Sequence, residues 1–440
     1  MTHPLSLIQR DLNHIWHPCS QMKDFENCPP LVVQSAKGVY LYTDKGPIID
    51  ATSSWWCKSL GHGHPAVIAA IQEQLNCFEH VIGAHTTHPN LVLLAEKLAE
   101  LSGKQHLFFA SDGSCAVEIS IKLALHAHQL KGNPQRQQII SLENGYHGET
   151  IGALSVSDLG LYKEPFKTWT KPCHILRDIP YVNDNTDPIW ANCDTIWPAI
   201  LKQLEEFKTT ACAIIVEPIV QGAGGMRCYS ADFLNRLAQF AKANDIYLIA
   251  DEIMTGVCRT GQWFASHHAN IEPDMICLSK GLTSGSIPLS CTLIDHDIYE
   301  LFYHDYSIGR SFLHSHTYGG NALAASAALA TLQIMQSENI NQQATELGAI
   351  MRQYFSEIAS LSGKLGPIRS LGAIVAADLS PHPTEKRIGF KFYQEALKLG
   401  ALIRPIDNTL YWLPPLTTKE DTIGKLAEIT LNSINKAYGN

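Results

Sequence analysis

Polar side chains follow several short apolar runs of the sequence, and their types are suited to a shared chemical task. Asp251 comes directly after YLIA, and Lys280 comes directly after MICLS. Gly113 and Ser114 come shortly after LFFA and open a segment of helical periodicity. If these runs are neighbouring strands of one sheet, their ends converge. The sequence then predicts one acid, one amine and one anion site in the same place.

A single cofactor would use all three groups. At a reference pKa of about 10.4, only roughly one lysine in 2,500 is neutral at pH 7, and a covalent bond to an aldehyde cofactor removes that limit. The free N–H groups of a helix start could hold a phosphate, and Ser114 adds a hydroxyl. A carboxylate such as Asp251, about 4 Å from a protonated ring nitrogen, gains roughly 4 kcal/mol before desolvation at an effective dielectric of 20. Pyridoxal 5′-phosphate matches all three requirements.

Each of these features also has a purely structural explanation. An aspartate after an apolar strand usually caps a turn or a helix, and a lysine there is usually solvated. Gly113-Ser114 could be an ordinary helix start. Tyr146, in GYHG, adds an aromatic face that could stack on a heteroaromatic ring. The prediction therefore depends on the combination of these residues and not on any one of them.

Two pairs of histidines raise the question of a metal site. His62 and His64 form HGH, and His314 and His316 form HSH. Neither pair has carboxylates at ligand spacing, so no metal ion is predicted. The 12 cysteines never occur as C-x-x-C, which removes the sequence support for a zinc or redox motif.

The composition of the 440 residues is that of a globular protein, with 45% hydrophobic and 17% charged residues. The formal net charge of −9, from 33 basic and 42 acidic residues, argues against a nucleic-acid or anionic-membrane partner. No apolar stretch reaches the roughly 18 residues of a transmembrane helix, and the first residues lack the apolar core of a signal peptide. Scattered cysteines suggest reduced thiols, so we expect a cytoplasmic protein.

Short apolar runs alternate with segments of helical periodicity along the middle of the chain. The runs lie at 107–110, 139–142, 213–216, 247–250 and 275–278. Such runs are typical of strands that are buried on both faces. Their alternation with helices predicts a mainly parallel sheet in a large α/β domain. We place this domain at 61–330. Turn pairs and mixed strands and helices at the two ends predict a smaller α+β domain formed by 1–60 and 331–440.

Three stretches of the sequence together resemble the class-III pyridoxal-phosphate aminotransferases of fold type I. They are AIIVEPIVQGAGGMRCYSADFL, LIADEIMTGVCRTGQWFA and PDMICLSKGLTSG. The similarity extends over nearly the whole chain, and the interval of 280 − 251 = 29 residues between the aspartate and the lysine fits this family. The resemblance implies a PLP-dependent enzyme that moves an amino group from a donor to an acceptor in two half-reactions.

The resemblance also assigns roles to single residues. Lys280, Asp251 and Tyr146 are the expected catalytic residues: Lys280 carries the cofactor, Asp251 holds its ring nitrogen, and Tyr146 stacks on the ring. Thr317 is expected to reach a phosphate from a second subunit, which implies a homodimer with shared active sites. The full set of expected cofactor-binding residues is Gly113, Ser114, Tyr146, Glu217, Asp251, Ile253, Lys280, His316 and Thr317.

A narrower resemblance concerns the substrate. HIWHP, SSWW, GYHGET, FLHSHTYGGNALA and LIRP are similar to the class-III members that convert 8-amino-7-oxononanoate to 7,8-diaminononanoate in biotin synthesis, with S-adenosyl-L-methionine as the amino donor. By this similarity Arg404 binds the carboxylate of the acceptor as a bidentate fork. The expected substrate-binding residues are Trp55, Trp56, Tyr146, Arg259, Lys280, Ser315 and Arg404.

The sequence departs from this pattern at two places. Cys19 stands where these enzymes usually have a tyrosine that helps to stack the adenine of the donor, and Ser315-His316-Thr317 replaces Gly-Pro-Thr. Lysine therefore stays open as an alternative donor. A class-III aminotransferase acting on an ω-amino acid, ornithine or 4-aminobutyrate is the nearest other function. A non-catalytic dinucleotide-binding protein is disfavoured, because the first strand–helix junction lacks G-x-G-x-x-G.

Overall fold

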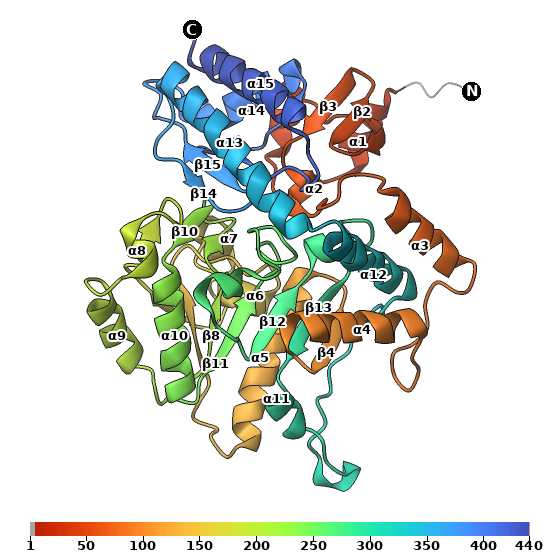
Figure 1. Ribbon diagram of the computed structural model, residues 1–440, viewed down its shortest axis with the longest axis vertical. Helices are drawn as coiled ribbons and strands as arrows, with labels where there is room; N and C mark the ends of the chain where they lie inside the picture. Colours follow the sequence, from red (N-terminus) through yellow and green to blue (C-terminus); the bar gives the residue numbers. More distant parts are fainter. Residues whose placement is uncertain (1–4, 440) are drawn as a thin grey trace.

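The computed structural model describes residues 5–439 and has a larger lower part and a smaller upper part (Figure 1). The lower part is built around a sheet of seven strands. The upper part contains both ends of the chain, since the first strands in red and the last helices in blue lie together there. The expected α/β fold, with a smaller part formed from both ends, is confirmed.

The large sheet has the strand order β4-β13-β12-β11-β8-β5-β6. Its strands are β4 (His106–Ala110), β5 (Gln138–Leu142), β6 (His174–Leu176), β8 (Ala211–Val216), β11 (Tyr247–Asp251), β12 (Met275–Leu278) and β13 (Ser290–Ile294). All of them run parallel except β13, which is antiparallel to both of its neighbours. The prediction of a mainly parallel sheet is therefore confirmed, and β6 and β13 are additional strands.

The central strands are apolar throughout because helices cover both faces of the sheet. In β8, Ala213 and Ile215 pack into a cluster with residues of α5 (Gly113–Leu130). The alternate residues Ile214 and Val216 pack into a second cluster with residues of α10 (Ala231–Ala243). Successive side chains of a strand point to opposite faces, so a strand covered on both faces needs apolar residues at every position.

The upper part joins segments that are far apart in the sequence. Its four-stranded sheet has the order β1-β2-β3-β16. The strands are β1 (Val33–Lys37), β2 (Tyr40–Thr43), β3 (Gly46–Asp50) and β16 (Ala401–Leu402). β16 pairs in parallel with β3, with Leu402 opposite Asp50. Residues that follow these two strands, near 55 and near 404, are thereby brought together.

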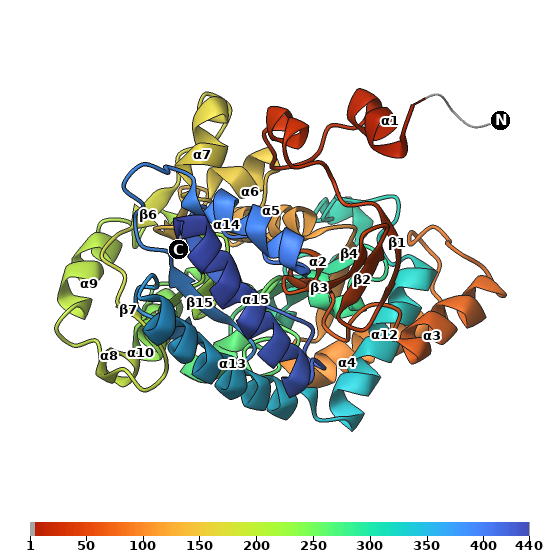
Figure 2. The same cartoon turned by 90° about the horizontal axis from the view of Figure 1, so that it is seen from above.

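A sheet of three short strands and three long helices complete this region, and a second three-stranded sheet lies below it in the larger part. The sheets contain β14 (Arg369–Ser370), β15 (Val375–Asp378) and β17 (Thr409–Trp412), and β7 (Tyr181–Val182), β9 (Val220–Gln221) and β10 (Arg227–Tyr229). The helices are α13 (Ile340–Ser362), α14 (Ile388–Leu399) and α15 (Glu420–Tyr438). Seen from above, α13 lies on one side of the upper part and α1 (Leu7–His14) lies on the other (Figure 2).

Of the other helices, η1 (Met22–Glu26) precedes β1 and α2 (Ser53–Trp56) follows β3 of the upper sheet, and the rest surround the large sheet or lie in its connections. The remaining α-helices are α3 (Pro65–Leu75), α4 (Pro89–Ser102), α6 (Ile151–Ser155), α7 (Gly160–Lys163), α8 (Pro188–Ala191), α9 (Trp197–Glu205), α11 (His296–Glu300) and α12 (Ala322–Ser337). The remaining 3-10 helices are η2 (Glu164–Phe166), η3 (Ala265–Ala269), η4 (Lys280–Thr283) and η5 (Tyr306–Ile308). Within residues 5–439, none of the helices combines the length and the hydrophobicity needed to cross a bilayer.

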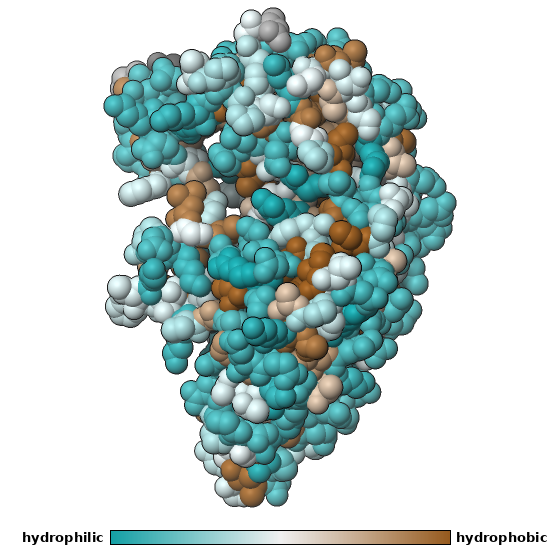
Figure 3. All heavy atoms as spheres, turned by 90° about the vertical axis from the view of Figure 1, so that its left-hand side faces the viewer, coloured by the Kyte–Doolittle hydropathy of each residue, from teal (hydrophilic) through white to brown (hydrophobic). Residues whose placement is uncertain are grey.

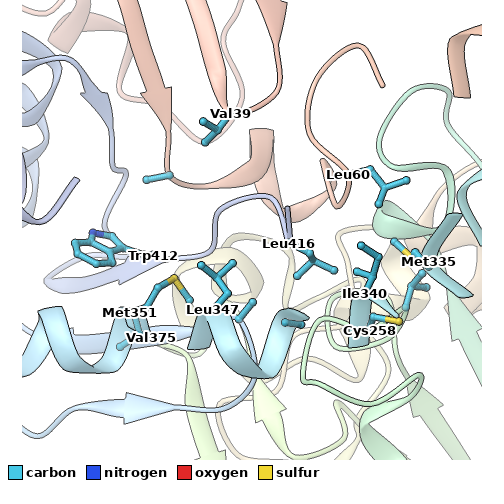
Figure 4. Close-up of a cluster of buried hydrophobic side chains, with 14 of the residues drawn as sticks. Val39, Leu60, Cys258, Met335, Ile340, Leu347, Met351, Val375, Trp412 and Leu416 are labelled. Atoms are coloured by element: carbon cyan, nitrogen blue, oxygen red, sulfur yellow. The ribbon is translucent and has the colours of Figure 1, made fainter. Parts of the chain in front are cut away.

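One hydrophobic core passes from the upper part into the lower part. Figure 4 shows Trp412 and Met351 at one end of this cluster and Leu60 and Met335 at the other, with Leu416 between them. The ring of Trp412 meets that of Phe355 edge to face, with centroids 4.6 Å apart. Because the two parts share this core, their relative position is fixed, and so is any site between them.

Candidate active site

A cavity of about 990 Å³ opens between the two parts of the molecule. Figure 3 turns the left-hand side of Figure 1 toward the viewer, and the outline of the molecule is indented there between the upper and lower parts. Residues after strands of the large sheet line one side of the cavity, and residues 19–30, 52–57 and 387–411 contribute to the other. This position, beyond the carboxyl ends of parallel strands, is where ligands bind in open α/β sheets.

Lys280 and Asp251 both line this cavity. Asp251 is the last residue of β11, and in the neighbouring strand it stands opposite Cys277. Lys280 follows Cys277 by three residues and begins η4 with a φ of 40°, in the left-handed region. The two residues are 29 positions apart in the sequence, and parallel pairing of their strands brings them to the same edge of the sheet.

A histidine holds the Asp251 carboxylate in place. His147 Nδ1 lies 2.8 Å from Asp251 Oδ2, and both side chains are buried. The backbone N–H of Ile253 donates to the other carboxylate oxygen at 3.2 Å. The backbone of His147 is itself fixed by a hydrogen bond to Ser157 Oγ at 2.9 Å. We did not predict this role for His147, although the residue lies in the GYHG motif that follows β5.

Glu217 is a second buried carboxylate beside Asp251. Its oxygens accept hydrogen bonds from the backbone N–H groups of Tyr146 and Gly222, both at 2.9 Å. Burial raises the pKa of Glu217 to about 7; the charge of His147 acts against this rise, and that of Asp251 adds to it. Glu217 therefore positions the Tyr146 backbone, while Asp251 has His147 as its side-chain partner.

The Lys280 side chain is half-buried, and it has no hydrogen-bond or ion-pair partner among residues 5–439. Its Nζ lies over the ring of Trp56, 4.7 Å from the centroid. Burial lowers the pKa of Lys280 below its usual value of 10.5, and the charges of Asp251 and Glu217 oppose this shift. A lowered pKa leaves more of the neutral amine, which is the form that attacks an aldehyde.

This shift predicts how the cofactor-free protein takes up pyridoxal 5′-phosphate. The rate of forming the borohydride-reducible adduct should reach its plateau at a lower pH than the same reaction of Nα-acetyl-lysine. The neutral fraction of an amine rises with pH, and a lower pKa moves that rise to lower pH. Rates measured across a pH series for both amines provide the comparison. Two coinciding profiles would contradict the shift.

The start of α5 also lines the cavity, in addition to Asp251 and Lys280. Gly113 and Ser114 are the first residues of the helix, and its free N–H groups favour an anion. Ser114 Oγ accepts a hydrogen bond from the backbone N–H of Glu149 at 3.3 Å. Gly148 has a φ of +120°, and a Cβ added there would lie 2.1 Å from Ser114 Oγ. Glycine at this position lets the loop lie directly against the helix start.

These groups fit pyridoxal 5′-phosphate. The Lys280 amine, the buried carboxylate of Asp251 and the start of α5 open into one cavity, as a cofactor with an aldehyde, a ring nitrogen and a phosphate requires. Tyr146 and Ile253 line the same cavity. Burial, with Glu149 as hydrogen-bond partner, keeps the pKa of Tyr146 well above its usual value, so its phenol stays neutral.

The two tryptophans of SSWW lie on the opposite side of the cavity. Residues 53–56 have φ values of 49°, 46°, 70° and 72°, a left-handed turn without glycine. Such a conformation costs roughly 1–2 kcal/mol per residue, so its surroundings must hold it. The guanidinium of Arg404 lies over Trp55, 5.1 Å from the ring centroid, and its Nη2 donates to the Cys19 carbonyl at 2.7 Å.

Arg259 does not line the cavity. Its Nη1 donates to the carbonyl groups of Pro414 at 2.7 Å and Ala373 at 3.3 Å, and its Nη2 is buried with no partner among the described residues. Burial lowers the pKa of Arg259 to about 9. This placement departs from the predicted substrate contact, because the backbone carbonyls hold the guanidinium behind the wall of the cavity.

Ser315, His316 and Thr317 also lie outside the lining of the cavity. His316 Nε2 lies 2.8 Å from His314 Nε2, and His314 Nδ1 lies 2.8 Å from Lys122 Nζ. For Thr317 the expected contact is with the active site of a second subunit. The roles of these three residues stay predictions.

Further residues line the cavity without having been predicted. Among them are Met254, Tyr162, Phe390, Tyr393 and Tyr411. The Tyr411 hydroxyl accepts a hydrogen bond from Trp56 Nε1 at 3.1 Å. Most of these residues come from segments with no recognisable motif, so their place in the lining could not be predicted.

Comparison with known proteins places the chain in a family. The family model described as Aminotransferase class-III matches residues 22–434. An adenosylmethionine-8-amino-7-oxononanoate aminotransferase from Helicobacter pylori is 36% identical over 428 residues, which covers 96% of this chain and 95% of that protein. The enzyme of the same name from Synechococcus elongatus is also 36% identical, covering 94% of this chain and 98% of that protein.

Solved structures agree with this placement. The adenosylmethionine-8-amino-7-oxononanoate aminotransferase of Methanocaldococcus jannaschii superposes with a TM-score of 0.90 at 31% identity and covers 98% of both chains. An omega transaminase from Pseudomonas jessenii, solved in complex with PMP, has a TM-score of 0.89 at 26% identity and covers 99% of this chain and 100% of that chain. The chain therefore belongs to the class-III aminotransferases and uses pyridoxal 5′-phosphate as its cofactor.

Proposed function

We propose that this enzyme transfers an amino group to 8-amino-7-oxononanoate, which gives 7,8-diaminononanoate for biotin synthesis. The relatives named for this reaction are similar over nearly their whole length. The observation that carries the proposal is the guanidinium of Arg404, which lies over Trp55 at the cavity wall formed by the upper part. Arg387 also lines the cavity, but its guanidinium is paired with Asp24, which leaves that of Arg404 for a ligand. A guanidinium beside apolar side chains suits a long aliphatic chain that ends in a carboxylate.

Different residues of the cavity bind the cofactor and transfer protons in this reaction. Bound pyridoxal 5′-phosphate supplies an aldehyde for the amino group and a ring that takes up electrons. Lys280, Asp251, Gly113 and Ser114 would hold it. The carboxylate of Asp251, itself held by His147, keeps a proton on the ring nitrogen. Lys280 Nζ is placed to accept the proton that leaves the amino-bearing carbon of the donor and to return one to the acceptor.

The amino donor in this proposal is S-adenosyl-L-methionine, in keeping with the names of the relatives. The donor end of the cavity differs from the family pattern, because Cys19 takes the place of the usual tyrosine. Cys19 has a φ of 49° and lines the cavity together with Tyr162 and Phe25. These two rings are the aromatic surfaces near Cys19 on which a donor could stack. Lysine is the alternative donor.

Three further features belong to the proposal. The active unit is a homodimer in which Thr317 of each subunit reaches the phosphate of the other, because Thr317 lies outside the cavity of its own chain. Ser315 and His316 would act from the same segment. The enzyme works in the cytoplasm; its 12 cysteines are all free, as reducing conditions would keep them.

A donor panel tests the function directly. Purified protein loaded with pyridoxal 5′-phosphate is incubated with 8-amino-7-oxononanoate and either S-adenosyl-L-methionine or lysine, and mass spectrometry detects the diamine. Formation of the diamine supports the proposal, and the better donor identifies the natural one. If neither donor gives diamine while ornithine or 4-aminobutyrate transfers its amino group to 2-oxoglutarate, the alternative function is correct.

Arg404 should decide how well the acceptor binds. Changing Arg404 to alanine is expected to raise KM for 8-amino-7-oxononanoate about 10- to 100-fold, because a hydrogen bond to a charged group is worth roughly 1.5–3 kcal/mol. Arg404→Lys should recover only part of this loss, since lysine lacks the planar fork. Steady-state kinetics with the acceptor varied give the values. An unchanged KM in Arg404→Ala would show that the carboxylate binds elsewhere.

A further inference from the structure

A buried carboxylate lies directly behind the two tryptophans of the active site. Asp50 ends β3 and is fully buried. One of its oxygens accepts hydrogen bonds from the Thr52 backbone N–H at 3.2 Å and from Thr52 Oγ1 at 3.1 Å. The other accepts from Ser54 Oγ at 2.7 Å and from His62 Nε2 at 2.9 Å. Four hydrogen bonds thus converge on a single side chain.

This carboxylate is the centre of the left-handed turn at residues 53–56. Four successive non-glycine residues with positive φ do not keep that conformation on their own. The carboxylate of Asp50 ties down both the start of the turn, at Thr52, and its second residue, Ser54. Ser53 Oγ adds a hydrogen bond to the Leu413 carbonyl at 2.7 Å. The turn is therefore set by the groups beneath it.

His62 connects this carboxylate to a rigid part of the fold. Its backbone N–H donates to the Gly38 carbonyl at 2.7 Å, and its carbonyl accepts from the Gly38 N–H at 2.8 Å. A Cβ added at Gly61 would lie 2.8 Å from the Gly38 carbonyl oxygen, so the two backbones are in close contact. The backbone of His62 is thereby bound to the turn between β1 and β2, and this fixes the imidazole that donates to Asp50.

The turn determines which cations the two tryptophans meet. Trp56 lies under Lys280 Nζ at 4.7 Å, and Trp55 lies under the guanidinium of Arg404 at 5.1 Å. Asp50 and Leu402 are opposite each other in paired strands, so the segments that carry Trp55 and Arg404 leave the sheet side by side. The left-handed turn therefore places the ring of Trp55 against the Arg404 guanidinium and the ring of Trp56 against the Lys280 amine.

We propose that Asp50, His62 and Ser54 are positioning residues of this enzyme. They hold the left-handed turn, so that Trp55 and Trp56 fix where the chain and the carboxylate of the acceptor lie relative to Arg404 and Lys280. Asp50 and His62 lie outside the lining of the cavity, and Ser54, which is part of the lining, donates its hydroxyl to Asp50. The identity of the acceptor rests on the proposed function, whereas the placement of the two tryptophans does not.

Four variants test this network, and two of them remove a hydrogen-bond donor to Asp50. Ser54→Ala removes the hydroxyl that donates to Asp50, and His62→Leu removes the imidazole N–H. His62→Gln keeps an N–H donor in this position and serves as the conservative variant. Asp50→Asn keeps the shape of the side chain and removes its charge. Circular dichroism and melting temperatures show whether each variant is folded.

A selectivity ratio separates positioning from general loss of stability. It compares kcat/KM for 8-amino-7-oxononanoate with kcat/KM for 2-aminooctan-3-one, which is the same acceptor without its carboxylate. We expect Ser54→Ala and His62→Leu to lower this ratio about tenfold, because small misplacements of substrate-orienting groups have effects of this size or larger. His62→Gln should stay within about twofold of the wild type.

Binding gives a second readout that does not depend on turnover. Calorimetry of octanoate binding to the holoenzyme reports the site for a carboxylate on an apolar chain, and its affinity should fall in parallel with the ratio. Asp274→Asn is the matched control. Asp274 accepts a hydrogen bond from the Leu248 N–H at 2.7 Å and precedes β12, at the end of the sheet away from Lys280. That variant should keep both the ratio and the affinity.

The outcomes are distinct. If folded Ser54→Ala and His62→Leu keep the ratio and the octanoate affinity within twofold of the wild type, the inference is wrong. The same two variants decide the question if Asp50→Asn does not fold. If the wild type shows no activity toward 8-amino-7-oxononanoate, the proposed function fails, and the octanoate affinities still test the placement of the tryptophans.

Discussion

Changing Lys280 to alanine is expected to abolish transamination, with a loss of at least about 10⁴-fold in kcat/KM. Among the described residues, Lys280 is the one lysine that lines the cavity, so no other amine is placed to replace it. The covalent adduct that borohydride fixes on the wild-type chain should also disappear, as mass spectrometry of the reduced protein would show. The cofactor should still bind without a covalent bond, because Asp251 and the start of α5 are unchanged.

Two further variants make this result specific. Lys280→Arg keeps a positive charge near Trp56 but cannot form the covalent bond, and we expect it to be as inactive as the alanine variant. Lys58 lies near η4, where its Nζ donates to the Gly285 carbonyl at 2.8 Å, yet it does not line the cavity. Lys58→Ala should therefore keep the borohydride-stable adduct. Substantial turnover by Lys280→Ala would exclude the mechanism proposed above.

The strands that could be predicted are those whose burial shows in their composition. The run at 213–216 is apolar at every position because β8 is covered by α5 on one face and by α10 on the other. β6 has three residues and β13 begins with Ser-Cys-Thr, so neither forms a clear apolar run. The pairing of β3 with β16 joins residues about 350 positions apart, and no local pattern encodes such a contact.

The same distinction applies to the site. Asp251 and Lys280 could be predicted to lie together, because both follow strands of one parallel sheet. The contact of His147 with Asp251 depends on the path of a loop after β5, which apolar periodicity does not define. For Arg259 the motif predicts a substrate contact, and in the structure its guanidinium donates to the backbone carbonyls of Ala373 and Pro414, a placement that the motif alone does not define.

Removing the charge of Asp251 should have the second largest effect. Asp251→Asn is expected to lower kcat/KM roughly a thousandfold, since a carboxylate about 4 Å from a protonated ring nitrogen contributes roughly 4 kcal/mol at an effective dielectric of 20. Asparagine has nearly the same shape, and its carbonyl oxygen can still accept the hydrogen bond that His147 Nδ1 donates at 2.8 Å to Asp251. The variant therefore tests the charge with little change in packing.

Glu217→Gln is the matched comparison for this prediction, because Glu217 is a buried carboxylate in the same cavity. Its oxygens accept hydrogen bonds from backbone N–H groups, and burial raises its pKa to about 7, so it is only partly charged near neutral pH. We expect Glu217→Gln to lose activity by about tenfold or less, well below the loss in Asp251→Asn. Steady-state kinetics with both substrates varied, together with the yield of the Lys280 adduct, distinguish lost catalysis from lost cofactor. Equal losses in the two variants would contradict the prediction that the Asp251 carboxylate stabilises the protonated ring nitrogen.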